Sequence, residues 1–526
     1  MIEEDRQRVR LIVLLTRTAP DVNPEYIPLK LAAIDKSLFW PALGIGIGLG
    51  ILFVVVGSVT LPWMIVIGAI CLFLLVSALI SPSMAFLMVV LVIPIERVGR
   101  FTEDTATFTI SVMRIAGMVA LTSLLFHGLL KKRSFFWGKS FFLYSGYLAC
   151  CLISVFYSRE YIQSIRAFGV LAGNLLFLFL IINSVRSWHL ARRSVQLWIL
   201  ASSLVGIYTI YDWHFGTVLD QGRIGISQTR SSTTYIDQSE HAEMRAVKRA
   251  MGPTSHPSVY GINMILTIPF FFFMLRAQKA SLWRIANWIG LAIVLYNIFL
   301  TNTRASLLGA LFALVLCGIY KLYRISFKNL AVIGLMLGML LPLVPADVAL
   351  RSLSLSNYTI EHSRTLAVRA EYWRTFLTLA KDNWLWGIGL GDRTTIAQLL
   401  SSEDVTDDQT SVHNEYMAAF LDAGILGWLL FVGFLISIIV TIRKTASRCK
   451  GLSTYVDAYW FLTASMVATF SAMFYGMQTD VFHLPLKGWW LVAGLSMALA
   501  RLSNDKISET ARLPLAVSPQ LAAKHP

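Results

Sequence analysis

Long apolar runs dominate the chain. Most of these runs are close to the roughly twenty residues that a helix needs to cross the hydrocarbon core of a bilayer. The run at 84–95 is too short to span it upright. The pattern predicts an all-α polytopic membrane protein with about 12–14 transmembrane helices. The expected helices lie near 39–57, 62–80, 84–95, 109–129, 136–156, 166–184, 194–212, 258–276, 283–300, 305–320, 329–345, 424–442, 456–475 and 482–500.

Composition supports membrane embedding. Of the 526 residues, 56% are hydrophobic and 14% are charged, whereas soluble domains carry about 25% charged residues. These values exclude a cytosolic enzyme, a secreted disulfide scaffold and a soluble repeat protein. The five cysteines have no spacing typical of a disulfide or a metal site. The cysteines give no sign of a metal site, and no cofactor is expected.

Basic residues gather in short loops at every second crossing, as expected of cytoplasmic loops. The alternation predicts a cytoplasmic N-terminal segment at 1–38, a transmembrane domain at 39–500 and a cytoplasmic tail at 501–526. Two long loops, at about 213–256 and 346–423, then face outward. The second loop holds eleven acidic and six basic residues. The net charge of +15 is therefore cytoplasmic, and nucleic-acid binding is not expected.

The outer loop at 346–423 contains helical spacing. Five apolar positions share one helix face. They are Leu366, Ala370, Trp373, Leu377 and Ala380. Two interpretations carry equal weight, a helix lying on the membrane interface with Trp373 downward and a packed extracytoplasmic helix. Gly387, Gly389 and Gly391 follow, and a tight turn is favoured over a phosphate loop because no strand precedes them.

Several basic residues lie in the expected outer loops, where the preference of Lys and Arg for cytoplasmic loops does not explain them. Arg245, Lys248 and Arg249 precede an outer membrane entry, and either bind an anion or pair with nearby glutamates. Arg304 lies in a very short turn at the outer edge of the bilayer. It either reaches lipid headgroups or faces a protein pocket. His413 is expected one or two helical turns outside the membrane.

Four motifs occur in a fixed order, and together they resemble the O-antigen ligase and Wzy-type polysaccharide polymerase family. The motifs are Arg249-x-x-Gly252 with Pro257, Thr303-Arg304-Ala305-Ser306, Trp373 leading to Trp386-Gly387-x-Gly389-x-Gly391, and His413-Asn414-x-Tyr416 with Gly424-x-x-Gly427. They span roughly 245–430. The chain departs from the family at Ser255-His256-Pro257-Ser258, where members often have Asn-Pro-Asn, and in its fourteen runs where members often have twelve spans.

The resemblance implies a GT-C-like inner-membrane glycosyltransferase with a large helical extracytoplasmic loop and a periplasmic, metal-independent site. Its donor is a glycan on undecaprenyl diphosphate, and its acceptor is a glycan or lipid A-core. Arg249 and Arg304 match arginines that bind the diphosphate, and His413 matches the family's essential histidine. Further contacts are expected from Arg369, Trp373, Tyr416 and Arg245. Other expected partners are membrane lipids, a chain-length regulator and a flippase.

The chemistry of these residue types agrees with that implication. Guanidinium groups stabilise the negative charge that develops on a leaving diphosphate. A neutral histidine near pH 7 can accept the proton of the attacking hydroxyl. Glu415 and Asp422 are alternative bases. The rival hypotheses are a transporter or flippase and an envelope scaffold, and the sequence does not separate a ligase from a polymerase.

Overall fold

The computed structural model describes most of the chain beyond residue 80, and all structural statements below concern that part. The expected runs at 39–57, 62–80 and 329–345 lie outside it. So do the N-terminal segment at 1–38 and the last residues of the tail. The described residues are 81–95, 112–132, 134–215, 234–237, 247–254, 256–278, 280–323, 364–391, 414–452, 455–479 and 487–512.

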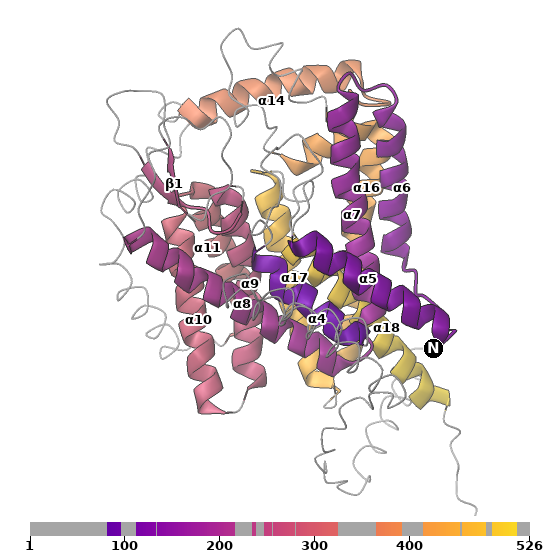
Figure 1. The fold of residues 1–526 in the computed structure, drawn as a ribbon, viewed down its shortest axis with the longest axis vertical. Coiled ribbons are helices and arrows are strands. Elements are labelled where there is room, and N and C mark those ends of the chain that lie inside the picture. The colour runs from indigo at the N-terminus through magenta and orange to yellow at the C-terminus, as the bar shows by residue number, and fades with distance from the viewer. Residues whose placement is uncertain are drawn as a thin grey trace, which may run out of the picture. The chain divides into compact units, whose positions relative to one another are not determined.

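The described chain is almost entirely helical, as predicted (Figure 1). The helices are α4 (Pro82–Val92), the 3₁₀ helix η2 (Ile93–Ile95), α5 (Val112–Leu130), α6 (Lys139–Val155), α7 (Tyr161–Ser184), α8 (Trp188–Phe215), α9 (Pro257–Ala277), α10 (Ser281–Leu300), α11 (Arg304–Ile319), α14 (Arg364–Asp382), α16 (Glu415–Cys449), α17 (Val456–Gly476) and α18 (Lys487–Arg512). The strands β1 (Thr234–Asp237) and β2 (Val247–Ala250) pair antiparallel within the expected outer loop at 213–256.

Six of the described helices are long and apolar enough to cross a membrane. They are α5, α7, α8, α9, α10 and α16. Pro82–Ile95, Lys139–Val155 and Arg304–Ile319 are apolar but shorter. The polytopic membrane class is therefore confirmed. The count of 12–14 spans stays a prediction, because three of the expected runs lie outside the described residues.

Helix α9 forms the centre of one half of the bundle. Its sequence is apolar on every face, and a helix of that kind has no surface suited to water. Nearly every side chain from Pro257 to Met274 is buried. The helix contacts α8, α10, α11 and α17. Strand β2, which carries Arg249, is separated from α9 by six residues and contacts it.

A second packing unit joins α6, α7, α16 and α18. Helix α16 lies beside α6 (Figure 1). Aromatic rings fill the space between these helices, and Tyr144 on α6 lies 4.9 Å from Phe434 on α16 and 4.8 Å from Trp490 on α18, measured between ring centroids. Aromatic pairs at this separation add to the free energy gained by burial.

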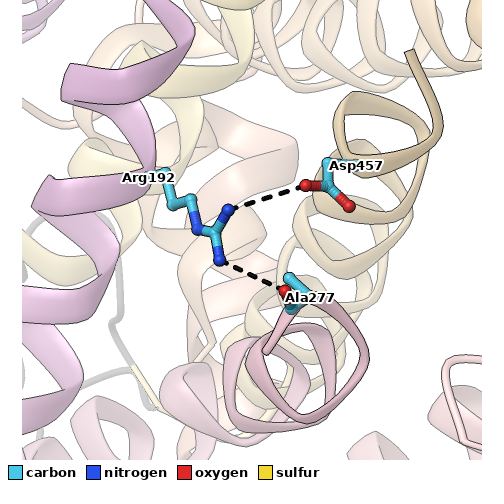
Figure 2. A network of polar contacts seen from close by, with 3 residues as sticks. All are labelled: Arg192, Ala277 and Asp457. Atoms are coloured by element: carbon cyan, nitrogen blue, oxygen red, sulfur yellow. Dashed lines mark hydrogen bonds and ion pairs between the residues drawn. The ribbon is translucent and has the colours of Figure 1, made fainter. Parts of the chain in front are cut away.

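Arginines join the helix ends at one end of the bundle. Figure 2 shows Arg192, at the start of α8, 3.7 Å from the carboxylate of Asp457 and donating to the carbonyl of Ala277 at 3.2 Å. Arg276, at the end of α9, donates to the carbonyl of Lys321 at 2.6 Å. A cation beside the last carbonyls of a helix complements the helix dipole. We call this set of contacts the arginine clamp.

The arginine clamp brings together loops that are distant in sequence. It joins the start of α8, the end of α9, the turn after α11 and the start of α17. Arg501 on α18 makes a similar bond, donating to the carbonyl of Val185 at 3.0 Å. These are loops in which the sequence places basic residues. The alternation of cytoplasmic and outer loops stays a prediction.

A substitution at Gly261 tests how closely α9 packs on α11. A Cβ atom at residue 261 would overlap the side chain of Ser306, whereas a Cβ at Gly173 on α7 meets nothing within 4 Å. We expect Gly261→Ala to lower the melting temperature of the detergent-purified protein by forcing the helices apart. Gly173→Ala should be neutral or stabilising, because alanine favours a helix over glycine by about 1 kcal/mol.

The double variant Gly261→Ala with Ser306→Gly supplies the control. Removing the Ser306 side chain should restore part of the lost melting temperature. An unchanged melting temperature in Gly261→Ala would contradict the close contact between α9 and α11.

Candidate active site

Strand β2 places Arg249 against the start of α9. The strand contacts α9 and α10, and Arg249 lies opposite Tyr235 in the strand register. Arg249 is half-buried and its Nε atom is shielded from solvent. After the strand, Gly252 has φ +53°, and a Cβ there would collide with the ring of Tyr260 on α9. Glycine is therefore needed for both the turn and the close approach.

His256 caps the start of α9. Its Nδ1 accepts a hydrogen bond from the backbone N–H of Ser258 at 3.1 Å, and Pro257 is the first helical residue. Because the backbone can only donate here, Nδ1 carries no proton in this arrangement. Asparagine is a preferred residue at this position. The departure from Asn-Pro-Asn therefore keeps the cap, with an imidazole nitrogen in place of an amide oxygen.

Arg304 is the first residue of α11. The turn from Leu300 to Arg304 joins α10 to α11 directly, with Asn302 in the left-handed region at φ +48°. The Nη1 atom of Arg304 is buried. Protein atoms alone produce this burial, which favours the protein-facing interpretation of Arg304 over contact with lipid headgroups.

The hydroxyl of Tyr475 joins three helix ends near these arginines. It donates to the carbonyl of Ser258 on α9 at 2.8 Å and lies 3.1 Å from the hydroxyl of Ser306 on α11. Beside it, the rings of Phe474 and Phe312 stack at 4.4 Å between centroids. The start of α9, the start of α11 and the end of α17 therefore meet at one end of the bundle.

Tyr416 attaches the start of α16 to the same place. Its hydroxyl donates to the carbonyl of Met473 on α17 at 3.0 Å. The helix is capped by Asn414, whose side-chain oxygen accepts the backbone N–H groups of Tyr416 and Met417 at 3.1 Å each. His413 precedes this cap and lies outside the described residues, as does Arg245. The structure thus positions the residue after His413 but not His413 itself.

The predicted helix in the outer loop is confirmed as α14, but its packing face differs from the predicted one. Phe376 is 1% exposed and packs with Leu421 of α16, whereas Leu377 is 52% exposed. Leu379 and Ala380 complete the contact. Spacing alone cannot choose between neighbouring apolar positions, because the choice depends on which face meets α16.

Two of the expected substrate contacts, Trp373 and Arg369, lie on α14. Trp373 is half-buried. Arg369 belongs to α14, but its side chain is outside the described part of the chain.

The glycine motif after α14 forms the tight turn that its spacing favours. Gly387, Gly389 and Gly391 have φ values of +80°, +111° and +89°. The turn enters a break in α16 at Gly424, where φ is +63° and ψ is −168°. A Cβ at Gly387 would overlap the backbone of α16, and one at Gly424 would overlap the backbone of the turn.

Backbone hydrogen bonds hold the turn in the break of α16. Ile388 N–H donates to the carbonyl of Leu421 at 2.7 Å, and Ile425 N–H donates to the carbonyl of Trp384 at 2.9 Å. These bonds satisfy groups that the break removes from the helix ladder. The turn also contacts α6, because Leu390 N–H donates to the hydroxyl of Ser154 at 3.1 Å.

Two carboxylates are buried in the first part of α16. Glu415 and Asp422 are both 0% exposed.

Within the described ranges, no group of three or more His, Cys, Asp or Glu residues is arranged to hold a metal ion. The positive groups at this end, Arg249 and Arg304, are suited to an anionic ligand.

The comparison with known families identifies the central part of the chain. Residues 289–432 match the family model described as O-Antigen ligase, Wzy_C. The central part of the chain is therefore similar to the O-antigen ligase family. The matched region runs from within α10 to within α16 and includes Arg304, Arg369, Trp373, His413 and Tyr416. Arg245 and Arg249 precede it. Among curated proteins, none matches this chain in sequence.

Sequence reasoning missed two residues that shape this end of the bundle. Tyr475 lies beyond the matched region, in a helix that looks like an ordinary apolar span. Its hydroxyl is the feature that joins α9 and α11. A tyrosine near the end of an apolar run is common in membrane proteins, so the sequence carries no signal of this role. His256 could have been found, because a residue before Pro at a helix start is a candidate cap.

One pair of variants tests both the glycine turn after α14 and the break in α16. Gly387 and Gly451 both have positive φ, but a Cβ at Gly451 meets nothing within 4 Å. We expect Gly451→Ala to cost about 1–2 kcal/mol from the left-handed backbone alone. Gly387→Ala should cost more, because the added atom also separates the turn from α16.

Thermal unfolding of the two purified variants measures the difference. Equal melting temperatures would mean that the turn does not enter the break in α16 as described.

Proposed function

We propose that the protein is a periplasm-facing glycosyltransferase of the bacterial inner membrane. It transfers a glycan from an undecaprenyl-diphosphate carrier to a sugar hydroxyl. The observation that supports the proposal best is the position of Arg304, which lies inside the region that matches the O-antigen ligase model and begins α11 with its Nη1 atom buried. A fixed cation of this kind suits the diphosphate of a lipid-linked donor.

The two ends of the bundle support the proposed topology. The arginine clamp lies at the end where α9 finishes and α17 begins, and Arg304 lies at the end where α9 begins and α17 finishes. Basic loops remain cytoplasmic by the positive-inside rule. The Arg304 end then faces the periplasm, and both termini are cytoplasmic.

Donor binding is assigned to Arg249 and Arg304. Their strand and helix are held together through α9, which contacts both β2 and α11. As the glycosyl–phosphate bond breaks, negative charge grows on the leaving diphosphate, and two preorganised guanidinium groups stabilise it. This arrangement supplies positive charge without a metal ion. The polyprenyl tail would lie among the apolar helices.

His413 is assigned the role of accepting the proton of the acceptor hydroxyl. An imidazole titrates near neutral pH and can receive this proton as the hydroxyl attacks. Glu415 and Asp422 are the alternative bases, but both are fully buried and so are less accessible to an acceptor glycan. Direct attack in one displacement inverts the anomeric centre.

The acceptor side of the reaction stays open between two activities. A ligase would transfer a finished polysaccharide to lipid A-core, and a polymerase would join repeat units on the carrier. Arg245, Arg369 and Trp373 are proposed as further substrate contacts. Tyr416 would contact substrate through its ring, because its hydroxyl donates to Met473. A flippase and a chain-length regulator are the proposed protein partners.

A transporter is the second candidate function. Transporters place broken helices and ionisable groups inside the bundle, and α16 has both, with a break at Gly424 and buried Glu415 and Asp422. The match to the O-antigen ligase model favours the enzyme. The two functions differ in what His413 does, since carrier transport has no need of a base at that position.

Complementation of a deletion strain tests the enzyme function. We expect Arg304→Ala and His413→Ala to abolish polymer or ligated glycan, a loss of about 100-fold or more for a catalytic base, with lipid-linked precursor accumulating. Arg284→Ala is the matched control, because Arg284 is exposed at the opposite end of α10. Membrane levels of each variant are measured in parallel.

The size of the accumulated precursor then separates the two activities. Single repeat units would indicate a polymerase, and long chains would indicate a ligase. Normal glycan output from well-expressed Arg304→Ala and His413→Ala would overturn the glycosyltransferase proposal and favour transport.

A further inference from the structure

Asn302 stands between α10 and α11, two residues before Arg304. Its side chain is 6% exposed. Its backbone is in the left-handed region, with φ +48°, and its N–H donates to the carbonyl of Phe299 at 3.0 Å. The residue therefore closes α10 and leads into the first turn of α11.

The side-chain amide of Asn302 has a feature that this backbone role does not explain. Its Nδ2 atom is buried and makes no hydrogen bond to any residue that the structure describes. Buried donors are nearly always paired in folded proteins, because an unpaired one forfeits its bonds to water. A left-handed residue after a helix is satisfied by glycine at least as well as by asparagine. The amide must therefore be explained separately.

The atoms around Asn302 favour an anion as the missing partner. The next residue, Thr303, is the N-cap of α11, but its side chain makes no capping bond and its hydroxyl instead donates to the carbonyl of Thr301 at 3.0 Å. The first N–H groups of a helix have no partner within it and carry partial positive charge. Arg304 follows with its buried Nη1. Amide, helix start and guanidinium all favour negative charge.

We propose that Asn302 is a further donor-binding residue, whose Nδ2–H donates to a diphosphate oxygen of the lipid-linked substrate beside Arg304. The inference rests on the proposed function, in which Arg304 binds that diphosphate. The diphosphate offers several acceptor oxygens, so it can take the guanidinium and the amide together. Asn302 fixes the orientation of the diphosphate, and Arg304 neutralises its charge.

Two substitutions separate this role from the backbone role of Asn302. Asn302→Gly keeps the left-handed turn and removes the amide. Asn302→Asp keeps the size and the tolerance for positive φ, but replaces the N–H donor with a negatively charged oxygen. If Asn302 served the turn alone, Asn302→Gly would bind substrate like the wild type.

The experiment measures binding of undecaprenyl diphosphate to the full-length protein in detergent, with undecaprenol as the lipid that lacks the diphosphate. We expect Asn302→Gly to raise the Kd for undecaprenyl diphosphate about 10-fold or more, as for a hydrogen bond to a charged group. Asn302→Asp should raise the Kd further by repulsion. Binding of undecaprenol and the melting temperature should change little in Asn302→Gly.

The outcomes distinguish this inference from the proposed function. Wild-type affinity in Asn302→Gly and Asn302→Asp, with affinity lost in Arg304→Ala, would overturn the role of Asn302 and leave the function intact. Equal affinity of the wild type for undecaprenyl diphosphate and undecaprenol would overturn the proposed donor site as a whole. Equal loss for both lipids in Asn302→Gly would show a structural defect and would also contradict the proposed role.

Discussion

The candidate active site depends on the junction at Tyr475. One hydroxyl donates to Ser258 at the start of α9 and bonds to Ser306 near the start of α11. Buried hydroxyls in an apolar bundle must be paired, since the bilayer offers no water. Pairing this one fixes three helix ends with respect to one another. Arg249 and Arg304 are attached to two of those ends through short connections, so their positions follow from the junction.

A second arrangement governs the start of α16. A helix that breaks inside a membrane protein exposes backbone groups that need new partners. Here the glycine turn after α14 supplies them at Leu421 and Ile425. The break and the turn therefore depend on each other, which accounts for glycines at Gly387 and Gly424. Through the same segment the chain carries Asn414 and Tyr416, the residues that follow His413, to the end of α17.

In the proposed function, the arginines at the two ends of the bundle have different roles. The arginine clamp uses cations to bind helix carbonyls, and its arginines are occupied with structure. At the other end, the proposed function assigns Arg249, Arg304 and the start of α11 to binding of the anionic donor. An enzyme that takes a diphosphate carrier from the membrane needs the second kind of cation at the membrane surface. The region that matches the O-antigen ligase model includes Arg304 and helix α14.

The sequence by itself determined the helices, because hydrophobic length and charge are local properties. The expected runs at 283–300 and 456–475 correspond to Ser281–Leu300 and Val456–Gly476, and the run expected from 424 begins at the glycine that breaks α16. Motif order also indicated the family whose model matches residues 289–432. The tertiary structure decided what depends on distant partners. It chose Phe376 over Leu377 as the packed residue, gave Tyr475 its two serines, and left the amide of Asn302 buried without a partner in the described chain. Contacts between residues far apart in sequence leave no periodic trace, so only the folded chain reveals them.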